Sequence, residues 1–308
     1  MRAPTCSTHA STTTVAAWAA MACGLFTAPP AFAWGDLGHE IVALIADHYL
    51  EPGVRTKVQS LLSSDRTRLT PDKGFAAEAT WADKFRDSDR GTRKPVHYNA
   101  TRNWHYVDLE IGAPPDLVSA CFGEPALPDG TLASNGPASD CIVDKINEFS
   151  AELRKPRLSK KERRLALQFL LHFIGDVHQP LHASDARDEG GNEKTVAGPG
   201  LTSSSLHAVW DTDFVGRLGP DATAVAAQLI SRVTPADQVH WSTGTPAAWA
   251  QESYETARAH AYGKLPPPTS PNHYTLTSAY EDDATAVCAT QLSKAGVRLA
   301  HVLNEGLK

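Results

Sequence analysis

The sequence predicts a mainly α-helical fold in a single domain, and three observations support this prediction. Apolar residues recur at spacings of three and four along most of the chain, as on the buried face of a helix. Segments in which apolar and polar residues alternate are few, so long loops and at most a small β-hairpin are expected. No internal repeat or low-complexity linker divides the 308 residues, which are enough for one large core.

The apolar spacing places the helices in order along the chain. They are predicted at 36–50, 54–63, 75–87, 139–153, 160–179, 207–217, 221–231, 246–262 and 274–305. The best strand signal is NWHYVDLEI, at 103–111. Gly, Pro, Asp and Ser cluster in long loops at 88–102, 112–138 and 183–206. Loops of this length are unusual unless they are functional or tied down, and here His and Asp residues lie at their edges.

Residues 1–33 have the pattern of a secretory signal peptide. They carry one charge, Arg2, followed by a mostly apolar run at 15–26 and by the small-residue site Ala31-Phe32-Ala33. The apolar run is shorter than the roughly 20 residues of a membrane span, and no later segment is apolar enough to cross a membrane. We therefore expect cleavage after Ala33, a mature domain at 34–308 that starts with Trp34, and a secreted or periplasmic protein.

Charge and cysteine content narrow the class of protein. A net charge of −6 argues against passive binding of polyanions, so bound cations would have to supply the attraction to a phosphate substrate. Cys121, Cys141 and Cys288 lie in the predicted mature chain. In an oxidising compartment they allow one disulfide, with one cysteine left over. We expect Cys121 to pair with Cys141 around a loop rich in Gly, Pro and Asp.

Two His/Asp pairs indicate metal binding. In LHFIGDVHQPLH, His172 and Asp176 are four residues apart and leave the same face of a helix, and His182 follows where Pro180 ends that helix. A second such pair, His207 and Asp211, occurs in LHAVWD. One such pair is usually an ordinary hydrogen-bonded pair. Two pairs with His182, all imidazole and carboxylate, favour zinc or a similar ion in a catalytic site.

Three other residues are further candidates for the site or for its support. His178 lies off the face of the first pair and is expected to have a structural role. Asp83 in TWADKFRD and His105 in NWHYVD are further ligand candidates, because a site with several ions needs more nitrogen and oxygen ligands. Each alone is weak evidence, since an Asp on a helix usually faces solvent and a His among aromatic residues usually packs in the core.

Together these motifs resemble the zinc-dependent single-strand nucleases known as the S-one/P-one family. The segments that carry the resemblance occur in the family's order: WGDLGH, WADKFR, WHYVDL, LLHFIGDVHQPLH, DEGGN and LHAVWD. The resemblance spans almost all of residues 34–308. It implies a helical fold of the zinc phospholipase C and single-strand nuclease type, which carries three zinc ions in a cleft. We also expect the protein to be a monomer. Ser205 stands where the family commonly has Asn.

The resemblance assigns the metal ligands residue by residue. The first zinc ion takes Asp83, His105, His172 and Asp176; the second takes the free amine and carbonyl of Trp34, with His39 and Asp176 as the bridge; the third takes His182, His207 and Asp211. Among these residues, Asp83 and Asp176 are also assigned catalytic roles.

The same resemblance implies the reaction and the substrate contacts. It implies cleavage of P–O3′ bonds in RNA and single-stranded DNA to 5′-nucleotides, and removal of 3′-phosphates from nucleotides. Arg86 matches a cation that stabilises charge in the transition state. Tyr106 matches an aromatic residue that stacks on a base, and Asp108 matches a group that hydrogen-bonds base edges.

Two alternatives to a nuclease remain open at this point. A zinc phospholipase C shares the fold and the number of ions, and Tyr106 and Asp108 do not exclude lipid head groups. A non-catalytic zinc-binding secreted protein is the second alternative. Ligand sets with open coordination positions argue against it, because structural zinc sites are usually closed by four protein ligands.

Overall fold

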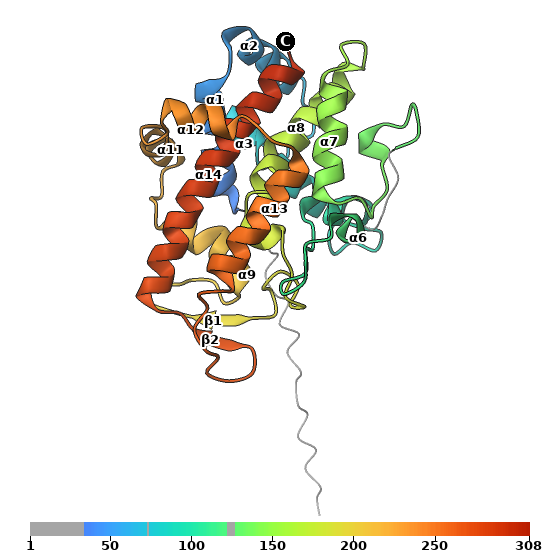
Figure 1. Ribbon diagram of the computed structural model, residues 1–308. Coiled ribbons are helices and arrows are strands. Elements are labelled where there is room, and N and C mark those ends of the chain that lie inside the picture. The colour runs from blue at the N-terminus through green and yellow to red at the C-terminus, as the bar shows by residue number, and fades with distance from the viewer. Residues whose placement is uncertain (1–33, 73, 122–126) are drawn as a thin grey trace, which may run out of the picture. The chain divides into compact units, whose positions relative to one another are not determined.

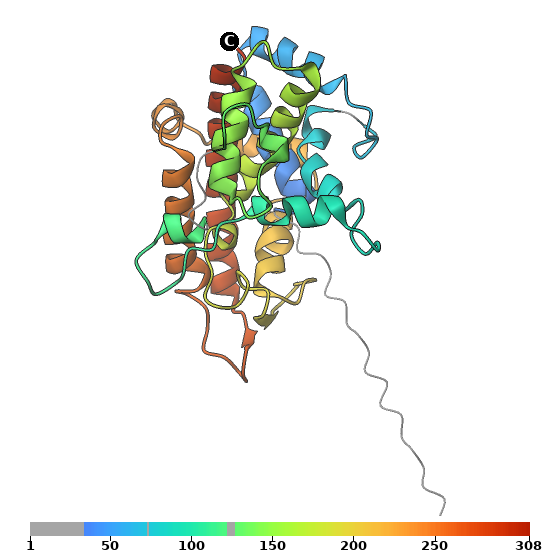
Figure 2. The ribbon, with the colours of Figure 1, turned by 90° about the vertical axis from the view of Figure 1, so that its right-hand side faces the viewer.

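The longest helix, α14 (Ser278–Gly306), is the element along which much of the domain packs. In the computed structural model, α1 (Asp36–Tyr49) lies along α14, and α8 (Lys160–Asp176) contacts both helices. Helix α7 (Ile142–Leu153) packs against α8, as Figures 1 and 2 show. The apolar faces of these helices meet in one core, so the predicted mainly helical single domain is confirmed.

The structure describes residues 34–72, 74–121 and 127–308. The predicted signal peptide, residues 1–33, lies outside the described residues. The other helical elements are α2 (Pro52–Leu62), α3 (Phe75–Glu78), α4 (Trp81–Asp87), α5 (Val96–Thr101), η1 (Arg102–His105), α6 (Leu117–Ala120), η2 (Ala133–Asn135), η3 (Pro180–His182), α9 (Leu206–Ala208), η4 (Val209–Asp213), α10 (Phe214–Gly216), α11 (Ala222–Ile230), α12 (Pro235–Trp241), α13 (Pro246–Thr256) and η5 (Ala257–Ala261). None of the described helices has the length and apolar character that crossing a membrane requires.

The strand prediction at 103–111 is wrong. This segment forms η1 and then an extended chain with separate backbone bonds, such as Val107 N–H to the His182 carbonyl at 2.8 Å, and one isolated parallel bridge between Glu110 and Asp185. The strands are instead β1 (Thr195–Ala197) and β2 (His273–Thr275), which pair in parallel. They are therefore not the small hairpin that the sequence allowed, because a hairpin joins antiparallel strands.

Several predicted helix limits also need correction. The helix expected at 75–87 is broken at Ala79 and Thr80 into α3 and α4. The loop expected at 88–102 contains α5, and the helix expected from 274 begins at Ser278 because β2 precedes it. In the segment expected at 207–217, α9 and α10 flank the π-helical turn η4. Such π-helical turns occur frequently at functional sites.

A disulfide and a buried lysine fix the loop that precedes α7. Cys121 pairs with Cys141, as predicted, and Cys288 is the free, buried cysteine of α14. The Lys145 ammonium lies 2.6 Å from the Asp140 carboxylate and 4.0 Å from the ring centroid of Trp104. These contacts hold the end of the loop and α7 against Trp104. Trp104 directly precedes His105, which is one of the candidate ligands.

Candidate metal centre

The carboxyl end of α8 carries the first candidate pair. Ser159 caps the other end of this 17-residue helix, and the last three turns are buried on all sides. His172 Nε2 lies 3.3 Å from Asp176 Oδ2, on one face of the helix as the spacing predicts. His172 Nδ1 lies 2.7 Å from the carbonyl of Ala79, at the break between α3 and α4. The break therefore frees a backbone acceptor that orients the imidazole.

Two further candidate ligands reach the same place from other elements. Asp83 comes from α4, and its Oδ1 lies 3.4 Å from His172 Nε2. His105 comes from η1, and its Nδ1 lies 3.0 Å from Asp176 Oδ2 and 3.5 Å from Asp83 Oδ1. All four side chains are buried. Residues 83, 105, 172 and 176 are thus brought together, although they are far apart in the sequence.

His39 and Trp34 approach Asp176 from the other side. His39 Nε2 lies 3.2 Å from Asp176 Oδ1, and its ring stacks on that of His172 at 3.7 Å between centroids. The indole N–H of Trp34 donates to the Gly175 carbonyl at 2.8 Å. A Cβ atom on Gly175 would lie 2.9 Å from His39 Nδ1, so this approach requires glycine. The two oxygens of Asp176 therefore face different groups of ligands.

A second cluster lies at His182, His207 and Asp211. The Nε2 atoms of the two histidines are 3.1 Å apart, and His207 Nε2 is 3.2 Å from Asp211 Oδ2. Ser205, the departure from the resembled family, accepts the Ala208 N–H at 3.2 Å and caps α9. The side-chain amide of Gln179 donates to Asp211 Oδ1 at 2.6 Å. The other oxygen of Asp211 is thereby left for the cluster.

Backbone carbonyls set the tautomers of three histidines. His172, His182 and His207 each have Nδ1 within 2.9 Å of a carbonyl oxygen, and those carbonyls belong to Ala79, His105 and Gly190. A carbonyl can only accept, so Nδ1 carries a proton and Nε2 is the ring nitrogen that points into the cluster. This is how imidazole ligands of metal ions are usually oriented.

The clusters contain buried polar atoms without partners. Atoms with no hydrogen-bond partner among the described residues include both ring nitrogens of His39, Nε2 of His172, Oδ1 of Asp176 and Oδ2 of Asp211. Leaving such a group unsatisfied costs about 1–3 kcal/mol, so their concentration in one place calls for a ligand. The described residues also group as His39–Asp83–His172, His105–His172–Asp176 and His182–His207–Asp211, with ligand atoms within 4.8 Å. Nitrogen and carboxylate donors without thiolate fit zinc-like ions.

The clustered imidazoles differ in pKa, and therefore in how readily they offer a neutral ring to a metal ion. Burial lowers the pKa of His39 and His182, and it lowers the pKa of His105 to about 4 and of His207 to about 3. These rings are therefore neutral at pH 7. Burial acts on His172 as well, but the carboxylates of Asp176 and Asp83 raise the pKa of that imidazole to about 10. A cation in the cluster would replace this proton.

His178 shows the contrast with the clustered histidines. Its Nδ1 lies 2.7 Å from the Ile174 carbonyl, and its Nε2 lies 2.7 Å from a guanidinium nitrogen of Arg298. Both ring nitrogens are therefore used within the fold. Burial and then the Arg298 charge lower the pKa of His178 to about 3, so the ring accepts from Arg298 as a neutral base.

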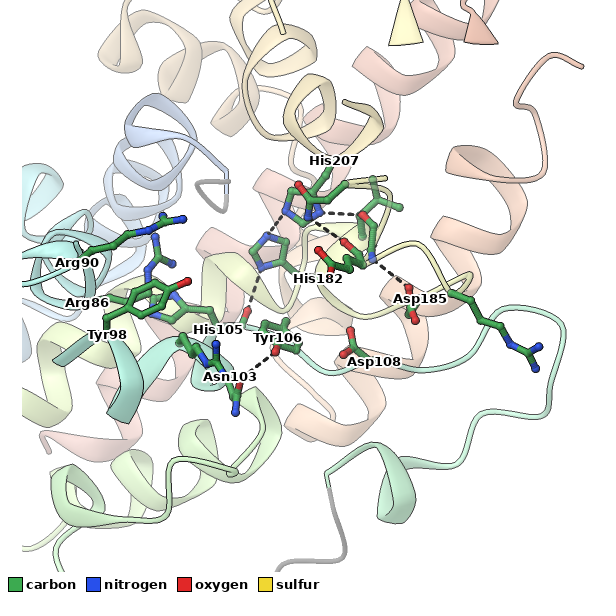
Figure 3. A pocket seen from close by; sticks show the side chains of 16 residues that line it. Arg86, Arg90, Tyr98, Asn103, His105, Tyr106, Asp108, His182, Asp185 and His207 are labelled. Atoms are coloured by element: carbon green, nitrogen blue, oxygen red, sulfur yellow. Dashed lines mark hydrogen bonds between the residues drawn. The ribbon is translucent and has the colours of Figure 1, made fainter. Parts of the chain in front are cut away.

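A pocket of about 530 Å³ opens onto both clusters. Its lining includes His105 from the first cluster and His182 and His207 from the second, as Figure 3 shows. Arg86 enters from α4, and its guanidinium lies 2.6 Å from Asp83 Oδ1. Tyr106 and Asp108, the two residues predicted to bind substrate, also line this pocket.

The predicted substrate contacts have distinct environments. The Tyr106 hydroxyl donates to Asn103 Oδ1 at 2.8 Å, which fixes the ring beside η1. Partial desolvation by the pocket walls, together with the charges of Asp185 and Glu189, raises the pKa of Asp108 to about 6. The far end of the pocket is therefore acidic, whereas Arg86 makes the opposite end basic.

Sequence reasoning missed several residues of the site. Gln179 could have been noticed, because it lies within the HQPLH segment between the two groups of ligands. Arg90, Tyr98, Arg102 and Asn103 also line the pocket. They fall in a segment predicted as loop and strand, and apart from Asn103, which begins NWHYVD, no motif marked them. Their proximity to the clusters depends on the packing of α4 and α5, which contact each other.

We expect Gln179→Leu to weaken metal binding at the second cluster. The variant removes the amide that holds Asp211, and losing such an outer partner typically costs about 10- to 100-fold in metal affinity. Zinc titration with a competing chelator would measure the change. Gln251→Leu is the matched control, because Gln251 is exposed on α13. Equal affinity in the Gln179 variant and the wild type would contradict a positioning role for this amide.

Buried clusters of His and Asp beside an open pocket, in a helical domain, are typical of metal-dependent hydrolases. The family model described as S1/P1 Nuclease matches residues 34–308, so the chain belongs to that family. It is 28% identical over 291 residues to nuclease P1 of Penicillium citrinum, covering 88% of this chain and 97% of that protein. Endonuclease 2 of Arabidopsis thaliana is 27% identical over 299 residues, covering 91% and 92%. Nuclease S1 of Aspergillus oryzae is 32% identical over 184 residues, covering 59% and 55%.

Proposed function

We propose that the protein is a zinc-dependent endonuclease and 3′-nucleotidase. It cleaves P–O3′ bonds of RNA and single-stranded DNA to give 5′-nucleotides, and it removes 3′-phosphates from nucleotides. The observation that carries this proposal is the shared pocket, in which the two His/Asp clusters meet Arg86 and Tyr106. Membership of a nuclease family supports the choice of nucleic acid as substrate.

The proposal assigns three zinc ions to the clustered residues. The assigned ligands are Asp83, His105, His172 and Asp176 for the first ion; Trp34, His39 and Asp176 for the second; and His182, His207 and Asp211 for the third. The split environment of the Asp176 carboxylate, with Oδ1 toward His39 and Oδ2 toward His105, supports its role as a bridge. Zinc ions bound there would supply Lewis-acid polarisation of the phosphate and lower the pKa of water.

The side chains around the clusters position the substrate. Arg86 is held by Asp83 and by both oxygens of Asp87, at 2.9 and 3.0 Å, so its guanidinium is already oriented when charge develops on the phosphate. Tyr106 offers its ring to an unpaired base, a face that a duplex hides. Asp108 accepts hydrogen bonds from a base edge at the acidic end of the pocket.

We further propose that the protein is exported and processed. Residues 1–33 act as the signal peptide, and Trp34 becomes the first residue of a secreted or periplasmic monomer. The Cys121–Cys141 disulfide supports an oxidising compartment. The Trp34 indole, held at Gly175 beside Asp176, supports a position for its amine close to the first cluster.

The test is an assay of the purified protein on two substrates. We expect hydrolysis of single-stranded DNA and RNA, loss of this activity with a chelator, and its return with added zinc. Hydrolysis of a phosphatidylcholine emulsion alone would instead indicate a phospholipase C. Absence of hydrolysis from zinc-loaded protein on both substrates would favour the non-catalytic alternative.

Replacing the proposed stacking residue should mainly weaken substrate binding. Stacking of a base on an aromatic ring is worth about 1–3 kcal/mol, so we expect Tyr106→Ala to raise KM by about 5- to 150-fold, with a smaller effect on kcat. Steady-state kinetics on a single-stranded oligonucleotide would measure both constants. Tyr106→Phe is the control, because it keeps the ring and loses only the bond to Asn103. An unchanged KM in the alanine variant would contradict the base site.

A further inference from the structure

A second aromatic ring lies on the basic side of the pocket, in contact with two arginines. We call Arg90, Tyr98 and Arg102 the Tyr98 wall. The guanidinium carbon of Arg90 is 5.0 Å from the centroid of the Tyr98 ring, and that of Arg102 is 6.0 Å away. All three residues line the same pocket as Tyr106. In Figure 3, Tyr98 and Arg90 lie beside Arg86, on the opposite side of the pocket from Asp108.

The positive charge of this wall is available to a ligand. Two other arginines of the pocket, Arg86 and Arg187, each pair with a carboxylate at 2.6 Å. Arg102 has no carboxylate within 4.0 Å in the described part of the chain. Arg90 lies 3.9 Å from Asp87, whose carboxylate already binds Arg86 in two places. The wall therefore carries charge that the fold does not neutralise.

The fold also holds the wall in position before a ligand binds. The Asp89 carboxylate accepts the backbone N–H groups of His97 and Tyr98, at 2.7 and 3.1 Å, and so ties the loop that carries Arg90 to the start of α5. The Ser88 hydroxyl lies 2.9 Å from His97 Nδ1. The ring of His97 in turn stacks on Phe85 of α4 at 4.2 Å. The backbone that carries Arg90 and Tyr98 is therefore ordered before a ligand binds, which lowers the entropic cost of binding at this wall.

We propose that the Tyr98 wall is a subsite for a second nucleotide of a single-stranded substrate. The guanidinium groups of Arg90 and Arg102 bind the phosphate next to the one that is cleaved, since a planar guanidinium matches phosphate oxygens. The Tyr98 ring stacks on the base of that nucleotide. Tyr106 and Tyr98 thus hold neighbouring nucleotides. This assignment rests on the proposed function, because it presupposes a nucleic acid in the pocket.

The subsite predicts a dependence on substrate length. We would compare octathymidylate with thymidine 3′-(4-nitrophenyl phosphate), a diester with one nucleoside. In the double variant Arg90→Ala/Arg102→Ala, we expect kcat/KM on the octamer to fall at least tenfold more than on the short diester. The slope of log KM for the octamer against log salt should become shallower by about 0.7, because the two arginines share one phosphate and each phosphate contact to a single strand contributes about 0.7. Tyr98→Leu should lower kcat/KM on the octamer without changing this slope.

Arg154→Ala/Arg157→Ala is the charge-matched control, because both of these arginines are exposed and neither lines the pocket. Equal losses in the control and the double variant would overturn the subsite in favour of a general charge effect. Equal losses on the octamer and the short diester would also overturn it. Fluorescence anisotropy with labelled octathymidylate separates the two proposals: binding without cleavage by the wild type refutes the nuclease assignment alone, whereas unchanged binding and cleavage by the double variant refutes the subsite alone.

Discussion

Asp176→Ala is expected to abolish hydrolysis and to remove two of the three proposed ions. The carboxylate of Asp176 lies within 3.3 Å of His39, His105 and His172. It therefore contacts the proposed ligands of both the first and the second ion. Ion-dependent stabilisation of transition-state charge is worth several kcal/mol, and its loss corresponds to a fall in kcat of at least about a thousandfold. Mass-spectrometric metal analysis and single-strand nuclease assays would measure the two effects together.

Asp282→Ala provides the control for Asp176. The Asp282 side chain is 80% exposed and lies 3.8 Å from Arg217, so its removal should change neither metal content nor activity. A full zinc complement in Asp176→Ala would contradict the assignment of Asp176 as the bridge. An inactive variant that keeps all its zinc would show instead that this carboxylate acts on the substrate.

Blocking the amino group of Trp34 is expected to remove one zinc ion and to lower kcat. If residues 1–33 are kept, or one alanine is added before Trp34, the nitrogen of Trp34 becomes part of a peptide bond, where its lone pair is delocalised and binds metal poorly. We expect one zinc ion fewer per molecule. We also expect kcat to fall at least about tenfold, because losing only the outer partner of a ligand already costs about 10- to 100-fold. Intact mass, metal content and activity of the same sample would be measured.

The control for this extension is one alanine added after Lys308, which is exposed at the other end of the chain. It should leave zinc content and activity unchanged. Full activity together with a full zinc complement in the protein extended before Trp34 would refute the assignment of its amine as a ligand. It would leave the indole contact with Gly175 as the only role of Trp34 at the site.

The features that sequence predicted best are those set by local helical geometry. The 3.6-residue period places His172 and Asp176 on one face of α8 without any knowledge of the tertiary fold. The four-residue spacing also brings His207 to Asp211, although the chain between them enters the π-helical turn η4. By contrast, the meeting of His39, Asp83 and the first pair depends on how α1 and α4 pack against α8. Spacing alone could not show this, and the prediction came from the resemblance to a family.

The errors have physical causes in the tertiary structure. At 103–111, apolar residues alternate with polar ones because Trp104 of η1 and Val107 and Leu109 of the extended chain face the core, while that chain forms one isolated bridge and no ladder among the described residues. Helix α5 was missed because its six residues are too short for a periodic signal, and its first N–H groups are satisfied by the distant Asp89 carboxylate.

The spread of the proposed ligands along the chain has a consequence for folding. They come from Trp34, which precedes α1, and from α1, α4, η1, α8, η3, α9 and η4, so each bound ion would close long loops of the chain. The described residues contain one disulfide, and ions in the clusters would act as additional cross-links between the helices. The melting temperature should then rise with the concentration of free zinc, because an ion that binds only the folded chain stabilises it by mass action.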